Sequence, residues 1–511
     1  MAEAPQVPKP VTARHHGAEG AGKRAAKTTV VRAAAEVIGK LATFVLFAAL
    51  ARGAGQTGVG VFVFAFAFLQ ICLMPVGFGC DSYLLRQVAK DRSAADRLFF
   101  SIIGLKLVLA GPVLAVSLVA VSLLGYDTTA RTTVYLLSVG LLLDLFAKTF
   151  HSIFDATERG HLHAVPLILQ RVVTAALGVT ALTLGYGVVT VAALYSVGAA
   201  LGLAACVFLM HRHVGMPRRA FDRHGWRTLA ATSLPFAIQD VFTVLLFKLD
   251  AVILSFMAAE AAVGRYGAAY RLLEATLFIG WALNGAFGAM YAYLGRDTDP
   301  TVGSVYERSI KVALVLLTPC AVVMGVLAEP ICRLSFGSDF VAAAPALRLL
   351  SPVVLGLCLV TLSSSLIISR RSPRTMVRMT ASMVLLNVLL NVSLIPSLEE
   401  RGAALAMLIT EIAFVGVAMR VASDEVGGLR WAVMLAAPLT AGIAMLPAMI
   451  LLVGLPVASL ATGLAVYVAA FVLLERRISP GDLAFVAAML KGRLPARLRR
   501  RVTDVATATQ E

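Results

Sequence analysis

Long runs of apolar residues, separated by short polar breaks, extend along almost the whole chain. Each run is about 20 to 25 residues long, which is the length of helix that crosses roughly 30 Å of hydrocarbon. The pattern predicts about fourteen membrane-spanning helices, near residues 29–51, 58–79, 97–124, 131–151, 162–185, 188–210, 228–257, 263–294, 305–328, 342–369, 375–396, 402–421, 430–453 and 456–475. These runs leave no room for a sizeable soluble domain.

The composition indicates the same class of protein. Of the 511 residues, 59% are hydrophobic and 14% are charged, whereas soluble proteins are roughly half apolar and a quarter charged. The mean hydropathy is +0.85. We therefore expect an all-α polytopic membrane protein, in which the six cysteines, which show no paired spacing, are small buried hydrophobes.

The net charge of +16 raises the possibility of a nucleic-acid partner. The basic residues, however, concentrate in alternate loops, as the positive-inside rule describes for cytoplasmic loops. The charge therefore predicts a multi-pass protein of the cytoplasmic membrane with both termini in the cytoplasm. Its expected partners include membrane lipids and exclude nucleic acid.

An internal echo divides the chain into two halves around the basic loop 211–227. The segment Val59–Phe66 aligns with Val263–Tyr270, matching a Val, a Gly, two aromatic positions and an Ala at equal offsets, and each copy opens the second helix of its half. A repeat with an even number of helices predicts two bundles related by an axis along the membrane normal, with a substrate site between them. A chance match in an apolar sequence is the alternative.

The resulting domain plan has six parts. A disordered cytoplasmic tail (1–28) precedes an N-terminal six-helix bundle (29–211), a basic cytoplasmic linker (212–227) and a C-terminal six-helix bundle (228–421). Two extra transmembrane helices (430–475) and a basic cytoplasmic tail (476–511) follow. The basic tail is explained either by topology or by attraction to anionic headgroups at the membrane surface.

Charged residues inside the predicted spans concentrate on the opening helices of the two halves. Such charges are costly in a bilayer and usually face a bundle interior or a wet cavity. The first helix carries Arg32, Glu36 and Lys40 at intervals of four, on one face. The second half carries Asp240, Lys248, Asp250, Arg271 and Glu274 on its opening helices, and Glu411 later.

These charges suggest a cavity for an anionic headgroup. The candidate headgroup ligands are Arg32, Lys40, Lys248 and Arg271, because Arg holds phosphate oxygens bidentately and Lys supplies a point charge. The candidate counter-charges, or coupling groups for protons or a monovalent cation, are Glu36, Asp240, Asp250, Glu274 and Glu411. The alternative is a set of structural ion pairs and of side chains that reach the interfaces.

Two further expectations concern helix geometry and cofactors. Pro235 precedes the stretch from Asp240 to Asp250 and is the candidate hinge, because proline interrupts helical hydrogen bonding. The histidines and cysteines show no spacing typical of a metal site. We therefore expect no metal and no cofactor.

Several segments together resemble the polysaccharide biosynthesis or oligosaccharide flippase family, part of the multidrug/oligosaccharidyl-lipid/polysaccharide exporter superfamily. They are Leu50–Gly60, Gly77–Gly79, Leu85–Ala89, Leu249–Leu254, Val263–Tyr266, Ala269–Glu274, Phe336–Phe340, Ala344–Leu350, Asn387–Asn391, Ile395–Pro396, Gly402–Ala406 and Thr410–Glu411. The resemblance implies two six-helix bundles around a V-shaped cavity, alternating access, and a polyprenyl-pyrophosphate-linked glycan as substrate. It also implies that the last two helices contribute a groove for the lipid tail, and that the protein works with other proteins of envelope polysaccharide assembly.

Other functions compete with a flippase. A cation-coupled multidrug exporter of the same superfamily would share the fold, but the cationic excess of the charged helices disfavours organic cations. A membrane-embedded glycosyltransferase or polymerase would need a long outer loop, whereas the predicted outer connections are only about 5 to 13 residues. We therefore predict a transporter and not an enzyme; a non-transporting scaffold is a third alternative.

Overall fold

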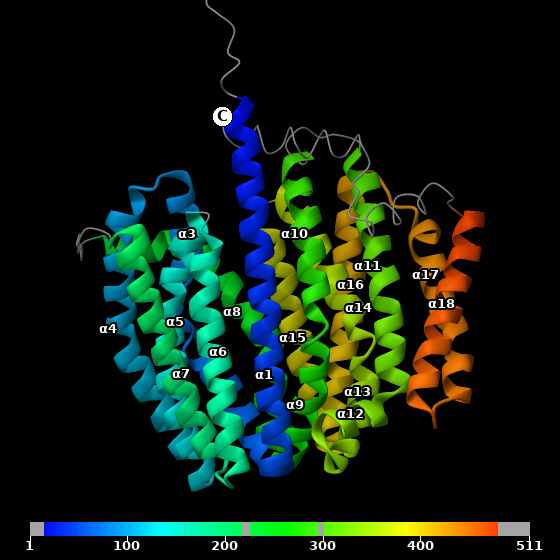
Figure 1. Ribbon diagram of the computed structural model, residues 1–511, viewed down its shortest axis with the longest axis horizontal. Coiled ribbons are helices and arrows are strands. Elements are labelled where there is room, and N and C mark those ends of the chain that lie inside the picture. The colour runs from blue at the N-terminus through cyan, green and yellow to red at the C-terminus, as the bar shows by residue number, and fades with distance from the viewer. Residues whose placement is uncertain (1–14, 158, 217–224, 295–300, 372, 479–511) are drawn as a thin grey trace, which may run out of the picture.

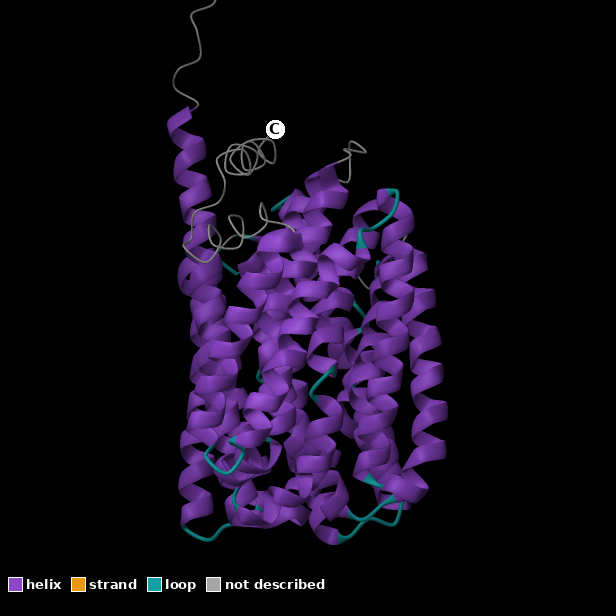
Figure 2. Cartoon of the chain, turned by 90° about the vertical axis from the view of Figure 1, so that its right-hand side faces the viewer, coloured by secondary structure: helices purple, strands orange, loops and turns teal. Residues whose placement is uncertain are grey.

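The computed structural model describes residues 15–157, 159–216, 225–294, 301–371 and 373–478, and no side chain before Ala34 is described. Within these residues every regular element is a helix (Figure 2). The all-α class is therefore confirmed. The helices run roughly parallel to one another, with short connections at the two ends of the molecule (Figures 1 and 2).

The first half begins with a long helix that is divided at one glycine. It contains α1 (His15–Cys72), α2 (Met74–Gly77), α3 (Cys80–Lys90), α4 (Ala94–Leu123), α5 (Thr128–Ala156), α6 (Gly160–Thr183), α7 (Val188–Leu209) and the π-helical turn η1 (Met210–Val214). Within α1, Gly55 has φ 65° and ψ −170°, a conformation essentially restricted to glycine. The chain reverses there, so that α3 lies near the end of the molecule at which α1 begins (Figure 1).

The second half and the C-terminal pair are also helical. They contain α8 (Trp226–Met257), α9 (Glu260–Glu274), α10 (Leu277–Leu294), α11 (Thr301–Val326), α12 (Ala328–Phe336), the 3₁₀ helix η2 (Ser338–Ala343), α13 (Ala344–Leu350), α14 (Val353–Arg370), α15 (Pro373–Leu398), α16 (Glu400–Val426), α17 (Trp431–Leu451) and α18 (Pro456–Ile478). Figure 1 shows α4 to α7 on one side of α1, and α10, α11 and α14 to α16 on the other.

Eleven helices among the described residues are long and apolar enough to cross a membrane. The divided α1 counts once in this set, and α8 and the pair α9 and α10 do not belong to it. A polytopic membrane protein is thus supported, whereas the count of fourteen spans stays a prediction. The first turns of α1 and the last turns of α18 lie at the same end of the molecule (Figure 1), so the described chain begins and ends on one side.

The structure differs from the predicted helices in several places, and α3 was not predicted at all. Helix α1 begins at His15 and not near residue 29, because Ala, Glu and Lys favour helix even where the chain is too polar to span a membrane. The predicted helix 263–294 breaks between α9 and α10, where the Thr276 hydroxyl donates to the Leu273 carbonyl and competes with helical hydrogen bonding. The connection after α11 is not a simple loop, since it folds into α12, η2 and α13.

The connection after α11 is held in place by aromatic packing. Phe336, at the end of α12, is buried, and its ring lies 5.8 Å from that of Phe44 and 5.7 Å from that of Phe47 on α1. Phe340 follows at 5.8 Å from Phe336. An apolar cluster of this kind between the halves fixes α12 and η2 against the turn of α1.

Helices α17 and α18 pack against α11 at the edge of the second half (Figure 1). A buried ion pair fastens them, with Lys311 Nζ 2.6 Å from Glu475 Oε1. At the start of α17, Arg430 donates to the Glu307 carboxylate on α11 at 2.6 Å. The C-terminal pair is therefore attached to the outer side of the second bundle.

Candidate functional site

The two echoed segments lie against each other, one in α1 and one in α9. Gly60 packs on the Glu260 carbonyl and Gly264 on the Gln56 carbonyl, so closely that a Cβ atom at either glycine would overlap the opposing backbone. Counted from the aligned glycines, Gln56 and Glu260 occupy equivalent positions. Each half therefore makes the same contact with the other, as at an interface on a two-fold axis.

Hydrogen bonds also join the two halves at the end of the molecule that carries the glycine contact. Arg52 donates to the Leu334 carbonyl at 2.6 Å, and the Gln56 amide donates to the Asp339 carbonyl at 2.6 Å. Arg265 donates to the side-chain oxygen of Gln56 at 3.2 Å. Together with the glycine contact, these bonds hold the two bundles together at the end that carries the Gly55 turn.

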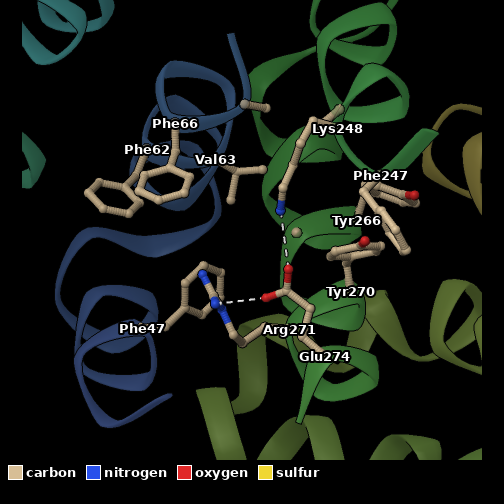
Figure 3. Close-up of a pocket in the computed structure, with 13 residues that line it drawn as sticks. Phe47, Phe62, Val63, Phe66, Phe247, Lys248, Tyr266, Tyr270, Arg271 and Glu274 are labelled. Atoms are coloured by element: carbon tan, nitrogen blue, oxygen red, sulfur yellow. Dashed lines mark hydrogen bonds and ion pairs between the residues drawn. The ribbon is translucent and has the colours of Figure 1, made fainter. Parts of the chain in front are cut away.

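A cavity opens beyond the glycine contact, on the following turns of the same helices (Figure 3). Its empty volume is about 470 Å³, and it lies between α1, α8 and α9. The residues that line it are Phe47, Phe62, Val63, Phe66, Ala67, Phe247, Lys248, Ala251, Tyr266, Gly267, Tyr270, Arg271 and Glu274. The cavity therefore lies between the two halves, where the repeat predicted the substrate site.

One wall of the cavity is charged. The Glu274 carboxylate bridges two cations: its Oε1 lies 3.2 Å from Lys248 Nζ, and its Oε2 lies 2.8 Å from an Arg271 nitrogen (Figure 3). The three side chains are 21–25% exposed, so they are partly open to the cavity. The buried Nε of Arg271 has no hydrogen-bond partner among the described residues, which leaves a donor beside the cavity.

The opposite wall is aromatic and comes from α1. Phe62 and Phe66 are stacked, with ring centroids 6.1 Å apart, and the Arg271 guanidinium lies 4.9 Å from the ring centre of Phe47. In the sequence alignment of the repeats, Phe62 and Phe66 correspond to Tyr266 and Tyr270 on α9. The lining is thus symmetric in position and asymmetric in chemistry, because the cations come from the second half alone.

Of the predicted charges of the first helix, Lys40 is the one that the structure connects with this cavity. Lys40 Nζ is 3.7 Å from the ring centre of Trp281 on α10, a cation–π contact between the halves, and Lys40 interacts electrostatically with Glu274. Glu36 pairs with Arg171 of α6 at 3.3 Å. Arg32 lies in α1 but falls outside the residues whose side chains the structure describes.

Asp250 lies behind the cavity wall and not in it. The side chain is buried, and its carboxylate accepts hydrogen bonds from the Tyr266 hydroxyl at 2.9 Å and from the Asn391 amide at 2.7 Å. Both carboxylate oxygens are therefore satisfied within the second bundle. The geometry gives Asp250 the role of holding Tyr266 in place.

The remaining predicted residues are spread along the second half. Asp240 is half-buried on α8 and interacts electrostatically with Lys148 of α5. Glu411 is 5% exposed on α16, and its Oε1 has no partner among the described residues. Pro235 lies inside α8, which continues as one helix from Trp226 to Met257, so its role as a hinge stays a prediction.

Sequence reasoning missed the aromatic lining of the cavity. Phe47, Phe62, Phe66 and Tyr270 line it, although the rings in the echoed segments were compared only to align the repeats. Phe62 and Phe66 in the first copy, and Tyr266 and Tyr270 in the second, are four residues apart, which places each pair on one helix face. That spacing was the signal that could have identified the aromatic wall.

Comparisons with known proteins agree with this arrangement. The family model described as polysaccharide biosynthesis protein matches residues 25–286, and a search of curated proteins finds no match. The fold is similar to the lipid II flippase MurJ in an inward closed conformation, with 14% identity, a TM-score of 0.70, and coverage of 88% of this chain and 99% of that chain.

Two other solved structures share the fold. A multidrug resistance MATE family transporter in an inward-facing conformation is 16% identical, with a TM-score of 0.62 over 78% of this chain and 98% of that chain. A MOP superfamily transporter from Pyrococcus furiosus, noted for the reverse polarity of its binding pocket, is 15% identical, with a TM-score of 0.60 over 80% of this chain and 96% of that chain. At these identities, the likeness concerns the fold alone.

Proposed function

Since the chain belongs to the polysaccharide biosynthesis protein family, we propose that it moves a lipid-linked oligosaccharide, carried on a polyprenyl pyrophosphate, across the cytoplasmic membrane. The fold is that of a multi-pass transporter. The observation that carries the substrate class is the carboxylate of Glu274 held between Lys248 and Arg271, opposite an aromatic wall.

The charged wall suits a pyrophosphate. Lys248 and Arg271 present two cations against one carboxylate, so the cluster keeps a net positive charge. A pyrophosphate would replace Glu274 as the partner of both cations, and Arg271 adds a buried Nε donor that has no partner in the part of the chain that the structure describes. Charge-assisted and bidentate hydrogen bonds of this type are stronger than hydrogen bonds between neutral groups.

The aromatic wall suits the rest of an amphipathic molecule. The rings of Phe62 and Phe66 make the wall across from the cations apolar. A headgroup with phosphates on one side and sugar or prenyl carbons on the other would match both walls at once. A simple inorganic anion would leave the aromatic wall unused.

Alternating access is supported by where the halves are joined. The described hydrogen bonds of Arg52, Gln56 and Arg265 close the end with the Gly55 turn, and the basic loops predict that this end faces outward. The substrate would then reach the cavity from the cytoplasmic end. Rocking of one bundle against the other would open the outer end, with Pro235 as the proposed hinge.

The best candidate for a group that couples transport to protons or a monovalent cation is Glu411. Both oxygens of Asp250 accept hydrogen bonds. Glu411 is buried, one of its oxygens has no hydrogen-bond partner within the described ranges, and it interacts electrostatically with Tyr270 of the cavity wall. A proton or a monovalent cation at Glu411 would therefore change the electrostatic potential at the cavity wall.

The rival function is export of organic cations, as in a multidrug exporter. The cavity offers such a substrate aromatic rings, but its single lining carboxylate is already paired with Lys248 and Arg271. An added cation would meet the net positive charge of this wall. The electrostatics therefore favour the anionic lipid.

The test is flipping of a fluorescent polyprenyl-pyrophosphate oligosaccharide in proteoliposomes. Lys248→Ala and Arg271→Ala should each lower the affinity for this lipid by about 10- to 100-fold, because each removes hydrogen bonds to a charged group. Arg348→Ala is the matched control, since Arg348 pairs with Glu329 at 2.7 Å at the exposed α12–α13 connection. It should flip lipid like the unaltered protein.

Two outcomes would contradict the proposal. One is flipping that survives both cavity substitutions while the variants remain folded, as shown by unchanged thermal unfolding in detergent. The other is a protein that ignores a range of lipid-linked glycans and exports an organic cation, which would establish the multidrug exporter instead.

A further inference from the structure

We propose that the lipid chain of the substrate leaves the central cavity through an apolar passage between α2 and α8. This inference rests on the proposed function, because it assumes a lipid-linked headgroup between Lys248 and Arg271. It assigns a second subsite for the same substrate molecule. The part of the substrate that binds there is the prenyl chain next to the phosphates.

The passage is a pocket with an empty volume of about 580 Å³. All of its lining residues are apolar: Met74, Pro75, Phe78, Leu234, Ala237, Ile238, Val241 and Phe242. Pro75 and Leu234 are exposed, so the pocket is open along one side. No charged or hydrogen-bonding side chain belongs to this lining, which is the composition that a hydrocarbon chain requires.

The pocket lies on the face of α8 that also lines the central cavity, nearer the start of that helix. On α8, Leu234, Ile238 and Val241 of the pocket are followed at helical intervals by Lys248 of the cavity. On the other side, Ala67 of the cavity is followed two helical turns later by Met74 of the pocket. A rise of about 1.5 Å per residue puts Val241 roughly 10 Å from Lys248 along α8.

The α2–α3 junction shapes the far wall of the passage. Phe78 and Gly79 both adopt positive φ, at 43° and 64°. Gly79 packs against the backbone of Phe236 and Ala237, where a Cβ atom would have no room. This close approach fixes α2 beside α8 while leaving Phe78 at the edge of the pocket.

A passage is needed because the two ends of the substrate require different surroundings. The phosphates would be held between the bundles, whereas the chain belongs in the bilayer, and hydrocarbon in a water-filled cavity is unfavourable. Moving the prenyl chain from the bilayer into the pocket changes its free energy little, because lipid is as apolar as the pocket. Its contribution is an apolar surface for the part of the chain that leads away from the cations.

The position of α17 and α18 favours this route over a groove at the C-terminal pair. Those helices pack on α11, and α10, α11, α14 and α16 lie between them and α1 in Figure 1. A chain that reached α17 from Lys248 would have to pass the second bundle. The pocket at Val241 lies on α8 itself, beside the cations.

Photolabelling of the unaltered protein in liposomes tests the passage. The probe is a prenyl-pyrophosphate-linked disaccharide with a diazirine on its first isoprene unit, and labelled peptides are identified by mass spectrometry. We expect labels in Leu234–Phe242 or Met74–Phe78, suppressed by an excess of the same sugar pyrophosphate without a chain. Suppressed labelling that falls on α17 or α18 would overturn the passage alone; labelling that the sugar pyrophosphate does not suppress would overturn the headgroup site as well.

A substitution that fills the pocket provides the second measurement. Val241→Trp should lose both the labelling and the flipping of the chain-bearing lipid. Ile443→Trp is the matched control, because Ile443 is 65% exposed on α17 and the change places the same indole ring at the rival groove. Loss of labelling and flipping in Ile443→Trp, with Val241→Trp unaffected, would overturn the inference.

Discussion

The contact between Gly60 and Gly264 makes a sharp prediction about the closed end of the molecule. Gly264→Ala adds one methyl group that overlaps the Gln56 carbonyl, and the contacting atoms are backbone, which cannot turn away as a side chain can. The helices must therefore separate. By the symmetry of the contact, Gly60→Ala should act in the same way through the Glu260 carbonyl.

The magnitude follows from the cost of overpacking. An extra methyl group in a close-packed contact costs about 1–3 kcal/mol, which corresponds to roughly a 5- to 150-fold change in an equilibrium constant. Because the strain is local to α1 and α9, it should destabilise the arrangement closed at this end relative to one in which the bundles have separated. Exchange of the amides near the contact should speed up by a similar factor.

Hydrogen–deuterium exchange followed by mass spectrometry measures this effect in peptides that cover residues 56–64 and 260–267. The matched control is Gly111→Ala, since Gly111 lies inside α4 and a Cβ atom there meets nothing within 4 Å. That change should leave exchange near the contact unaltered and favour the helix slightly. The reasoning is refuted if Gly264→Ala and Gly111→Ala behave alike in exchange and in thermal unfolding.

Two further predictions concern buried polar contacts and are measured by unfolding in detergent. Lys106 is fully buried and donates to both Asp81 oxygens at 2.8 Å. Lys106→Met should therefore cost about 3–5 kcal/mol, because it leaves the buried carboxylate without its counter-charge, and adding Asp81→Asn should recover part of this loss. Equal stability of the single variant and the parent would contradict this prediction. Tyr266→Phe removes the hydroxyl that donates to Asp250 and should cost about 1–3 kcal/mol, an expectation that fails if the unfolding temperature does not fall.

The two halves of the internal repeat contribute different side chains to the cavity. Both copies of the repeat place side chains at equivalent positions around the two-fold contact, yet Ala67 stands in the first half where Arg271 stands in the second. A symmetric dimer would have to carry the same chemistry on both walls. Within one chain, the halves can differ, so one wall can carry Lys248 and Arg271 while the other carries Phe62 and Phe66.

The sequence by itself determined the features that depend on local composition. Apolar runs of membrane length predicted a helical membrane protein, and the echo around Gly60 and Gly264 predicted two related halves. The orientation that the basic loops indicate stays a prediction. The charges at Lys248, Arg271 and Glu274 were identified because ionisable residues are rare in such runs. None of these inferences requires knowledge of which helices are neighbours.

Only the tertiary structure decided which of these residues meet. Lys248 and Asp250 are two residues apart on α8, yet Lys248 lines the cavity with Glu274 while Asp250 is buried against Tyr266. Hydrophobic periodicity could not separate them, because lipid is as apolar as a bundle interior and the outward and inward faces of a membrane helix look alike. The rotation of each helix is set by packing contacts such as that of Gly60 with α9, and these exist only once the chain has folded.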